Sequence, residues 1–276
     1  MRNRPGRIVA DIVAALLCVI MAFPIYWMVN TSFKQSADIK TPKPKFLPLH
    51  GTFQHYLDAV HKPGFTTMLS NSLVVTSSSV VLGIAAAFLA AVAVARFRFA
   101  GRKTYLVMLL IAQMIPLEAM VIPVYLMFRP LNLVNNLVGL IAWYMVFVMP
   151  FAVLTLRSFI QNIPASLEEA AMVDGCGRAK AFWRVTFPLV APGLATTAIY
   201  GFIQAWSEFI FALTLMHQQD KQTLPVWLVS FNNRYTGLDW GAWMAASTLF
   251  TLPALVLFLF VQRKVTTGLV AGGVKG

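Results

Sequence analysis

Charged residues are scarce in this sequence. They account for 12% of its 276 residues, whereas hydrophobic residues account for 58%, and the mean hydropathy is +0.71. A soluble globular domain carries charges at roughly a quarter of its positions, so this composition excludes an ordinary soluble fold. Long apolar segments with few charges are typical of transmembrane helices. The sequence therefore predicts an all-α integral membrane protein.

Sequence motifs for catalysis and cofactor binding are also missing. The chain has no G-x-x-x-x-G-K-[ST] loop, so we expect it not to bind the phosphates of ATP. Cys18 lies in an apolar run and Cys176 in a polar one, which argues against a disulfide and against a metal site. No metal-ligand cluster or nucleophile–base pair is present. We therefore expect this chain to be no enzyme and to hold no metal or other cofactor.

Acidic residues are fewer than basic ones, and the formal net charge is +12. Such an excess could suggest a nucleic-acid partner. Here the Lys and Arg residues lie in loops beside apolar runs, as they do next to membrane-spanning helices. We therefore expect contact with membrane lipid and not with nucleic acid.

Long segments without charge locate the spans. Six segments each reach the ~20 residues that a spanning helix requires. They are 8–33 (with Asp11), 63–95, 104–128 (with Glu118), 130–156, 185–219 (with Glu208) and 240–262. The sequence therefore predicts six transmembrane helices in a single domain that covers 1–276, with both ends on one side.

The distribution of Lys and Arg predicts the orientation. Fourteen of the 22 basic residues lie on the side of the two termini. The positive-inside rule then places both termini in the cytoplasm and the chain in the plasma or inner membrane. An outer loop follows at 34–62, which suits contact with a soluble external partner or a plain connector. The basic start and the first apolar run resemble a signal peptide, but the run is longer than a typical h-region, so we expect an uncleaved first span.

The longest charged and polar run between two spans is Pro164–Pro188, within a predicted cytoplasmic loop at 157–188. Its pattern indicates two short helices joined by a turn that Gly175 and Gly177 bracket. The second piece, Arg178–Phe187, is basic and aromatic. We expect Pro188 to open the next span.

The first short helix carries a predicted N-terminal cap. Ser166 followed by Glu169 fits a capping box, in which the hydroxyl and the carboxylate satisfy free backbone N–H groups. Glu168 and Glu169 are expected in the first turn, where a carboxylate meets the positive end of the helix dipole.

The spacing of this loop resembles the EAA loop of ABC importer permeases. The matching residues are Glu169-Ala170-Ala171, then Gly175 after three intervening residues, and Val185-Thr186-Phe187-Pro188 after nine more. The family's pattern usually ends Ile-x-Leu-Pro, so Val185 and Phe187 depart from it conservatively. In the family this loop is a coupling helix that docks on a separate ATPase subunit; an ordinary amphipathic interfacial loop is the alternative. The resemblance implies ATPase docking by Ser166, Glu168, Glu169, Ala170, Ala171, Asp174, Gly175, Arg178 and Pro188.

Two further segments are similar to the same family. Ala95–Arg102 is a short basic turn like the family's, and the tail at 263–276 resembles the end of maltose-type sugar permeases, where it reaches into the ATPase dimer. The tail residues implied are Gly272, Gly273 and Lys275; a frayed tail is the alternative. The resemblance covers nearly the whole chain and implies a carbohydrate importer permease of the maltose-system smaller type. The implied partners are a second permease, an ATPase dimer that binds ATP and an extracytoplasmic sugar-binding protein.

Polar residues within the spans are candidates for the substrate pathway. Pro116 and Pro123 predict a broken or bent third span, and Glu118 lies between them, either as a functional carboxylate or as a solvated one at the interface. Polar and aromatic groups of the fifth span suit either sugar contacts or helix packing. The pathway candidates are Asn71, Gln113, Glu118, Gln204, Trp206 and Glu208.

Glu118 and Glu208 also support a second hypothesis, an ion-coupled secondary transporter. Such a transporter would use these carboxylates and would not need the EAA-like loop. An intramembrane enzyme would need a convergent acid–base pair, and neither carboxylate has an obvious partner in the sequence.

Overall fold

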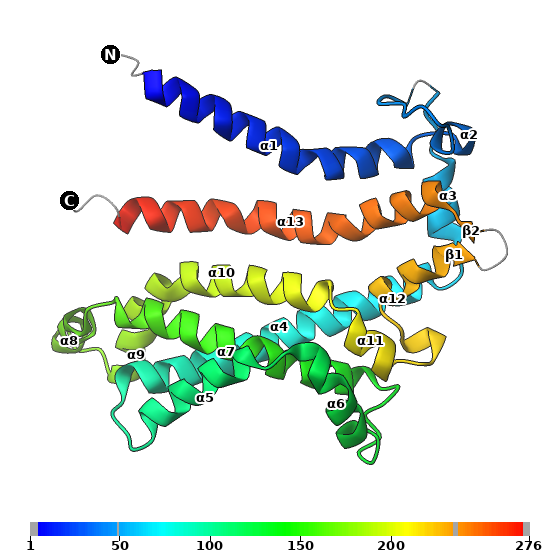
Figure 1. Ribbon diagram of the computed structural model, residues 1–276. Coiled ribbons are helices and arrows are strands. Elements are labelled where there is room, and N and C mark those ends of the chain that lie inside the picture. Colours follow the sequence, from blue (N-terminus) through cyan, green and yellow to red (C-terminus); the bar gives the residue numbers. More distant parts are fainter. Residues whose placement is uncertain (1–4, 49, 234–236, 273–276) are drawn as a thin grey trace. The chain divides into compact units, whose positions relative to one another are not determined.

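The computed structural model describes residues 5–48, 50–233 and 237–272, and within these ranges it describes the side chains from residue 9 to residue 262 except that of residue 233 (Figure 1). Helices dominate the described part, and its two strands form one antiparallel pair of two residues each. In chain order the elements are α1 (Pro5–Ser32), α2 (Ser36–Ile39), α3 (Gln54–His61), α4 (Phe65–Arg96), α5 (Arg102–Met114), η1 (Leu117–Met120), α6 (Val121–Phe128), α7 (Leu137–Gln161), α8 (Ala165–Val173), α9 (Arg178–Ala181), η2 (Phe182–Thr186), α10 (Phe187–Trp206), α11 (Ile210–Leu215), η3 (Gln219–Lys221), α12 (Leu224–Leu228), η4 (Val229–Phe231), β1 (Asn232–Asn233), β2 (Gly237–Leu238) and α13 (Trp240–Gly272).

Five helical segments are long and apolar enough to cross a membrane. They are Val9–Ser32, Phe65–Arg96, Leu137–Gln161, Arg178–Trp206 and Trp240–Gln262. These apolar runs form helices because a helix satisfies every backbone N–H and C=O internally, as a bilayer core requires. The described residues therefore contain five of the predicted spans as long helices.

The third predicted span is a bent pair of helices. α5 and the η1–α6 segment meet at 95° and make up a sixth span if they are counted together. Pro116 lies at the break, before η1, and proline has no N–H to donate to a helix. The prediction of a broken or bent third span is confirmed, and the total agrees with six.

The chain divides into two compact units. The first contains Met1–Thr66 and Trp227–Leu252, and the second contains Thr67–Val226 and Pro253–Gly276. Within the first unit, the His55 ring nitrogen Nε2 lies 2.9 Å from the Lys34 carbonyl oxygen. The Trp227 indole N–H donates to the Pro63 carbonyl at 3.1 Å. These bonds hold α3 and α12 to the segments beside them.

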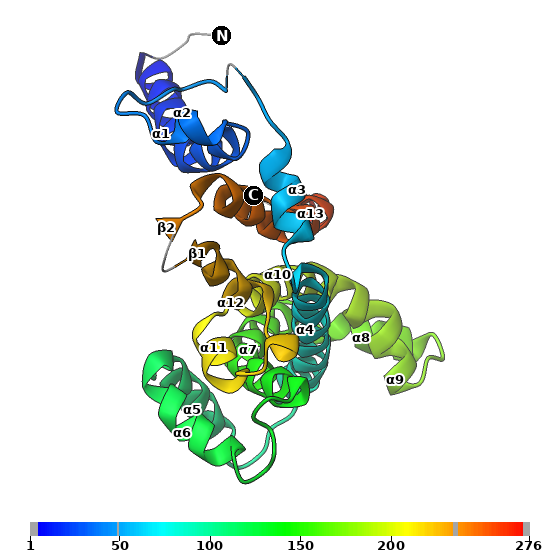
Figure 2. The ribbon, with the colours of Figure 1, turned by 90° about the vertical axis from the view of Figure 1, so that its right-hand side faces the viewer.

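The second unit is built around α7, which packs against α10 and α5 (Figure 1, Figure 2). Close approach of α7 and α10 depends on Gly193, because a Cβ atom there would lie 2.6 Å from the Phe159 ring. Buried residues of α4 complete two apolar clusters, one with Tyr144 and Phe211, the other with Val148 and Val190. These clusters fix the positions of the helix ends that carry the polar groups described below.

The start of the fifth span differs from the prediction. α9, η2 and α10 run into one another, and the spanning segment begins at Arg178, ten residues before Pro188. Pro188 lies in the first turn of α10, directly after the π-helical turn η2. A first-turn proline needs no N–H partner, and the irregular turn before it lets the helix continue. Pro188 therefore does not open the span.

Candidate functional site

The loop at 157–188 contains the predicted pair of short helices, and a glycine separates them. α8 ends at Val173, and Gly175 has φ = 87°, a conformation that glycine adopts freely. The Gly175 N–H donates to the Met172 carbonyl, and the Cys176 N–H donates to the Ala171 carbonyl. This pair of bonds is a Schellman motif, in which glycine is strongly preferred. The predicted glycine turn is confirmed at Gly175, whereas Gly177 has φ = −64° and precedes α9.

The predicted capping box is wrong. α8 begins at Ala165 after Pro164, and no side chain caps its N-terminus. Ser166 already has a helical backbone there, so its hydroxyl is not placed to bond the N–H groups ahead, as an N-cap must. The rigid φ of Pro164 favours this earlier start. Glu168 lies in the first turn as predicted, and Glu169 follows it one residue beyond.

Glu168 turns inward and contacts two other elements. Its Oε1 atom lies 2.8 Å from Nη2 of Arg96, at the end of α4, and it accepts a hydrogen bond of 2.5 Å from the Thr186 hydroxyl of η2. Arg96 also donates through Nη1 to the Ile163 carbonyl at 3.3 Å. The sequence analysis missed both Arg96 and Thr186 as partners. The signals available were a basic residue at the end of a span and a hydroxyl in the loop, and neither identifies a partner by itself.

Most of the other predicted docking residues are exposed. They are Ser166, Glu169, Ala170, Asp174, Gly175, Arg178 and Pro188, and Ala171 is half-buried. Apolar side chains accompany them, with Leu167 at 44%, Met172 at 38% and Val173 at 87% exposure. Exposed apolar side chains among polar ones are typical of a protein-interaction surface. Among the nine predicted docking residues, Glu168 alone faces both Arg96 and Thr186.

Glu208 is held by hydrogen bonds within the second unit. Its carboxylate accepts from the Tyr144 hydroxyl at 2.6 Å and from the backbone N–H groups of Phe211 and Ala212 at 2.8 and 3.1 Å. Those N–H groups belong to the first turn of α11, so Glu208 satisfies donors that a helix start leaves unpaired. Tyr144 is 1% exposed. The sequence analysis missed Tyr144, although its hydroxyl stands in an otherwise apolar span and needs a partner.

The other pathway candidates lie in different settings. The Asn71 side-chain amide donates to the carbonyls of Asp220 and Gln222 at 2.8 and 2.9 Å. Gln204 donates to the Tyr200 hydroxyl, and Trp206 is 3% exposed and stacks on Phe202. Gln113 and Glu118 are exposed near the bend of the third span. The structure thus brings Glu208 to Tyr144, and Asn71 to η3 and the residue after it. Helix packing accounts for Trp206.

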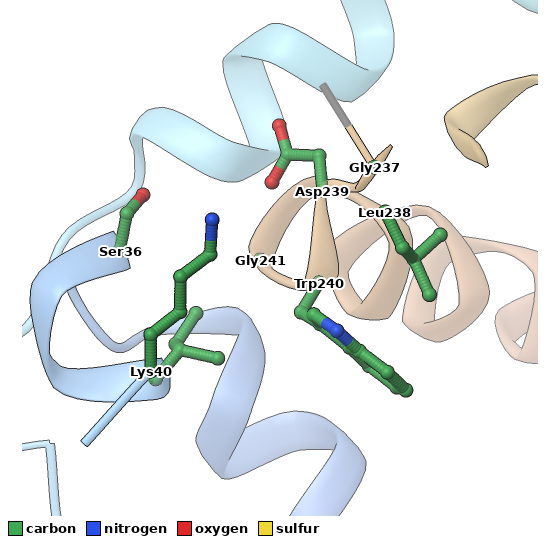
Figure 3. A pocket seen from close by; sticks show the side chains of 8 residues that line it. Ser36, Lys40, Gly237, Leu238, Asp239, Trp240 and Gly241 are labelled. Carbon is green, nitrogen blue, oxygen red and sulfur yellow. The ribbon is translucent and has the colours of Figure 1, made fainter. Parts of the chain in front are cut away.

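A cavity of about 250 Å³ lies in the first unit, next to the start of α13 (Figure 3). Ser36 and Lys40 line it from the α2 segment, and Asp239, just before α13, and Trp240, the first residue of α13, line the other side (Figure 3). A neighbouring cavity of about 320 Å³ is also lined by Lys40 and Trp240. The sequence analysis did not predict these cavities, because residues distant in sequence line them.

Lys34 lines the second of these cavities. Its side chain is buried, and its Nζ lies 4.2 Å from the centre of the Trp27 ring. Burial lowers the pKa of Lys34, and the Asp38 carboxylate opposes that shift. Contact with an aromatic face stabilises the ammonium group.

The predicted tail contacts lie largely beyond the described region. Gly272 is the last residue of α13, and Gly273 and Lys275 are outside the described residues. Within the described residues, no group of three or more His, Cys, Asp or Glu side chains is arranged to hold a metal ion.

A protein-family profile described as "binding-protein-dependent transport system inner membrane component" matches residues 79–269. The chain is 46% identical to the diacetylchitobiose uptake system permease protein DasC of Streptomyces coelicolor, over 100% of this chain and 99% of that protein. It is 34% identical to the sulfoquinovosyl glycerol transport system permease protein SmoH of Agrobacterium fabrum, over 98% of this chain and 95% of that protein. It is 33% identical to the trehalose/maltose transport system permease protein MalG of Thermococcus litoralis, over 98% of this chain and 97% of that protein.

Two solved structures have a similar fold. One is a bacterial ABC transporter involved in the import of the acidic polysaccharide alginate, with a TM-score of 0.79 and 24% identity over 95% of this chain and 98% of that chain. The other is a bacterial alginate ABC transporter in complex with an alginate pentasaccharide-bound periplasmic protein, with a TM-score of 0.68 and 15% identity over 95% and 94%. At these identities the likeness concerns the fold.

Proposed function

Because this chain belongs to the family of binding-protein-dependent transport system inner membrane components, we propose that it is a permease subunit of an ATP-driven sugar importer. It is a multi-pass membrane protein and a transport component, not an enzyme. With a second permease it forms the translocation pathway, and both of its termini lie in the cytoplasm. A separate ATPase dimer binds and hydrolyses the ATP.

The observation that carries this proposal is the exposed side of the loop at 157–188, which we call the coupling loop. A short helix with a fixed end presents three apolar side chains, Leu167, Met172 and Val173, among polar ones. This is the surface that a coupling helix needs to bind a cleft on an ATPase. ATP-dependent closure of that cleft can shift the permease from one conformation to another only if the coupling loop binds the open and closed states of the ATPase with different free energies.

The substrate class follows from the relatives. The names of three of them refer to diacetylchitobiose, a sulfoquinovosyl glycerol and trehalose or maltose, all of which contain sugars. We propose a short saccharide as the substrate, with diacetylchitobiose the first to test. An extracytoplasmic binding protein delivers it, as the complex of the alginate transporter with a periplasmic protein supports by analogy.

The ion-coupled alternative receives no support from Glu208. Its carboxylate accepts three hydrogen bonds, two of them from backbone N–H groups. A carboxylate that carries a proton across a membrane must release such bonds in each cycle. Glu118 is exposed and lies in η1, next to the bend of the third span.

The test is transport by the reconstituted complex. The chain is assembled with its second permease, ATPase and binding protein in proteoliposomes, and uptake of diacetylchitobiose and maltose is measured with ATP or with an ion gradient alone. We expect uptake only with ATP, and Glu118→Gln and Glu208→Gln should remain ATP-dependent. Uptake driven by an ion gradient alone, lost in either Gln variant, would establish the secondary transporter instead.

A further inference from the structure

The inward side of the coupling loop is held to α4 by polar contacts, beside ring contacts of Phe88 with Phe182 and Phe187. Arg96, Glu168 and Thr186 come from three different elements, α4, α8 and η2, and we call them the inner tie. The guanidinium of Arg96 and the hydroxyl of Thr186 both contact the same oxygen of Glu168, at 2.8 and 2.5 Å. Arg96 also holds the Ile163 carbonyl, between α7 and α8. The tie therefore links the end of α4 to both the start and the end of the loop.

The inner tie is largely shielded from solvent. The side chains of Arg96 and Glu168 are 18% and 16% exposed, and Thr186 is 0% exposed. A charge-assisted contact is stronger when water is excluded from it, and removing one partner leaves the other charge poorly solvated. The three groups should therefore move together when the loop moves.

α4 can carry such a movement to the other end of the unit. It is one continuous helix from Phe65 to Arg96. Near its other end, Asn71 donates to the carbonyls of Asp220 and Gln222, and the Ser72 hydroxyl accepts from the Leu224 N–H at 2.7 Å. At ~1.5 Å per residue, Asn71 and Arg96 lie roughly 38 Å apart along the helix. α4 is thus bonded at one end to the coupling loop and at the other to the segment before α12.

We propose that Arg96, Glu168 and Thr186 are positioning residues for coupling, which transmit displacement of the coupling loop into α4 and, through Asn71 and Ser72, to the segment at 220–224. This rests on the proposed function, since it requires an ATPase that moves the loop. Glu169, the next residue, faces outward and serves docking. Adjacent carboxylates thus divide two tasks: one binds the partner and the other passes the movement inward.

The experiment measures sugar uptake per ATP hydrolysed by the complete reconstituted transporter. The variants are Glu168→Gln, which removes the charge and keeps the shape, and Thr186→Val, which removes the hydroxyl. We expect each to assemble with the ATPase and to lower uptake per ATP roughly 3- to 10-fold, because hydrolysis continues while its movement is transmitted less well. Thr186→Ser, which keeps the hydroxyl, should retain the ratio of the unaltered protein.

A charge exchange tests the contact directly. Arg96→Glu should lower the ratio of sugar uptake to ATP hydrolysed. The double variant Arg96→Glu/Glu168→Arg should have a higher ratio than either single variant. Arg98→Glu is the matched control, because Arg98 is exposed two residues away and has no part in the tie; it should leave the ratio unchanged.

The outcomes separate the tie from the proposed function. If Glu168→Gln and Thr186→Val take up as much sugar per ATP hydrolysed as the unaltered protein, the proposed role of the inner tie is wrong. It is also wrong if these variants only reduce the amount of assembled complex and leave uptake per ATP unchanged, because that result indicates a role in folding alone. If Glu168→Gln does not assemble with the ATPase, the uptake per ATP of Thr186→Val decides whether the inner tie contributes to coupling. If the unaltered chain shows no ATP-dependent uptake, the proposed function itself fails.

Discussion

Two carboxylates in the second unit, Glu208 and Glu168, have similar partners and different consequences. Each accepts a hydrogen bond from a buried hydroxyl, Tyr144 at 2.6 Å for Glu208 and Thr186 at 2.5 Å for Glu168. Glu208 also accepts from backbone N–H groups three and four residues further along the chain. Glu168 pairs with the guanidinium of Arg96, on a different helix.

The difference shows how the source of the donors decides what a carboxylate does. Two of the three donors to Glu208 come from the following turn and stabilise the start of α11, and the third is Tyr144 of α7. The charged partner of Glu168 is Arg96, at the end of α4, so the ion pair links the coupling loop to another helix. Loss of Glu208 should therefore appear mainly as lost stability, whereas loss of Glu168 should appear as lost coupling.

The largest stability effect is expected for Glu208→Leu. The Tyr144 hydroxyl and the N–H groups of Phe211 and Ala212 lose their acceptor in a buried setting, at a cost of about 2–4 kcal/mol. Thermal unfolding in detergent should show a clearly lower Tm, while uptake per ATP of the folded fraction stays near that of the unaltered protein. Glu208→Gln, which keeps an acceptor, is the control and should lose less. An unchanged Tm in Glu208→Leu would contradict the capping role.

Gly175→Val should have the next largest effect and should act on coupling. Valine at φ = 87° costs about 1–3 kcal/mol of backbone strain. No atom lies within 4 Å of the Cβ position, so the strain arises from the backbone conformation alone. We expect insertion into the membrane with weakened co-purification of the ATPase and reduced sugar-stimulated hydrolysis.

The matched control for that change is Gly177→Ala. Gly177 has a negative φ and equally open surroundings, so alanine there should leave ATPase binding nearly intact. Normal assembly and coupling in Gly175→Val would count against the coupling-loop assignment.

Tyr144→Phe separates the hydroxyl from the carboxylate at Glu208. The variant removes one hydrogen bond and leaves the backbone donors in place, so the free energy of unfolding should fall by about 1 kcal/mol. Uptake per ATP should not change, in contrast with Thr186→Val, which removes the corresponding hydroxyl from Glu168. Equal effects of the two variants on uptake per ATP would remove the distinction between the two carboxylates.

Ser166→Ala should have the smallest effect, within about 0.5 kcal/mol on stability. Ser166 is exposed and does not cap α8. Asn136→Ala is the comparison, because the Asn136 side chain does cap α7 by accepting from the Val138 N–H at 3.0 Å, and its loss should cost about 1 kcal/mol. A comparable loss in Ser166→Ala, measured by thermal unfolding, would restore the capping box.

The predictions from sequence succeeded where the cause is local. The spans follow from the sum of hydropathy over ~20 residues, and the bend at Pro116 and the turn at Gly175 follow from the geometry of single residues. The capping box was wrong although it is also a local motif. Its sequence pattern is satisfied, but helix α8 starts two residues too early for Ser166 to act as the cap.

The candidate site was predicted in part, because sequence reasoning can list polar residues in spans but not their partners. It selected Glu208 and missed Tyr144, which lies 64 positions earlier in the chain. It placed Glu168 on the docking surface with Glu169, and the structure separates them, since neighbouring residues on a helix point about 100° apart. Asn71 was selected as a pathway residue, and its observed bonds are to backbone carbonyls of the segment after α11.

The sequence by itself determined the class of protein, the spans and the place of the glycine turn. Each depends on the free energy of local segments in lipid or on the allowed φ of one residue. Only the tertiary structure decided that Arg96 meets Glu168 and Thr186, and that Tyr144 meets Glu208. Those contacts depend on how α4, α7 and α10 pack against one another, and the packing arises from many apolar contacts at once, none of which marks the polar partners in the sequence.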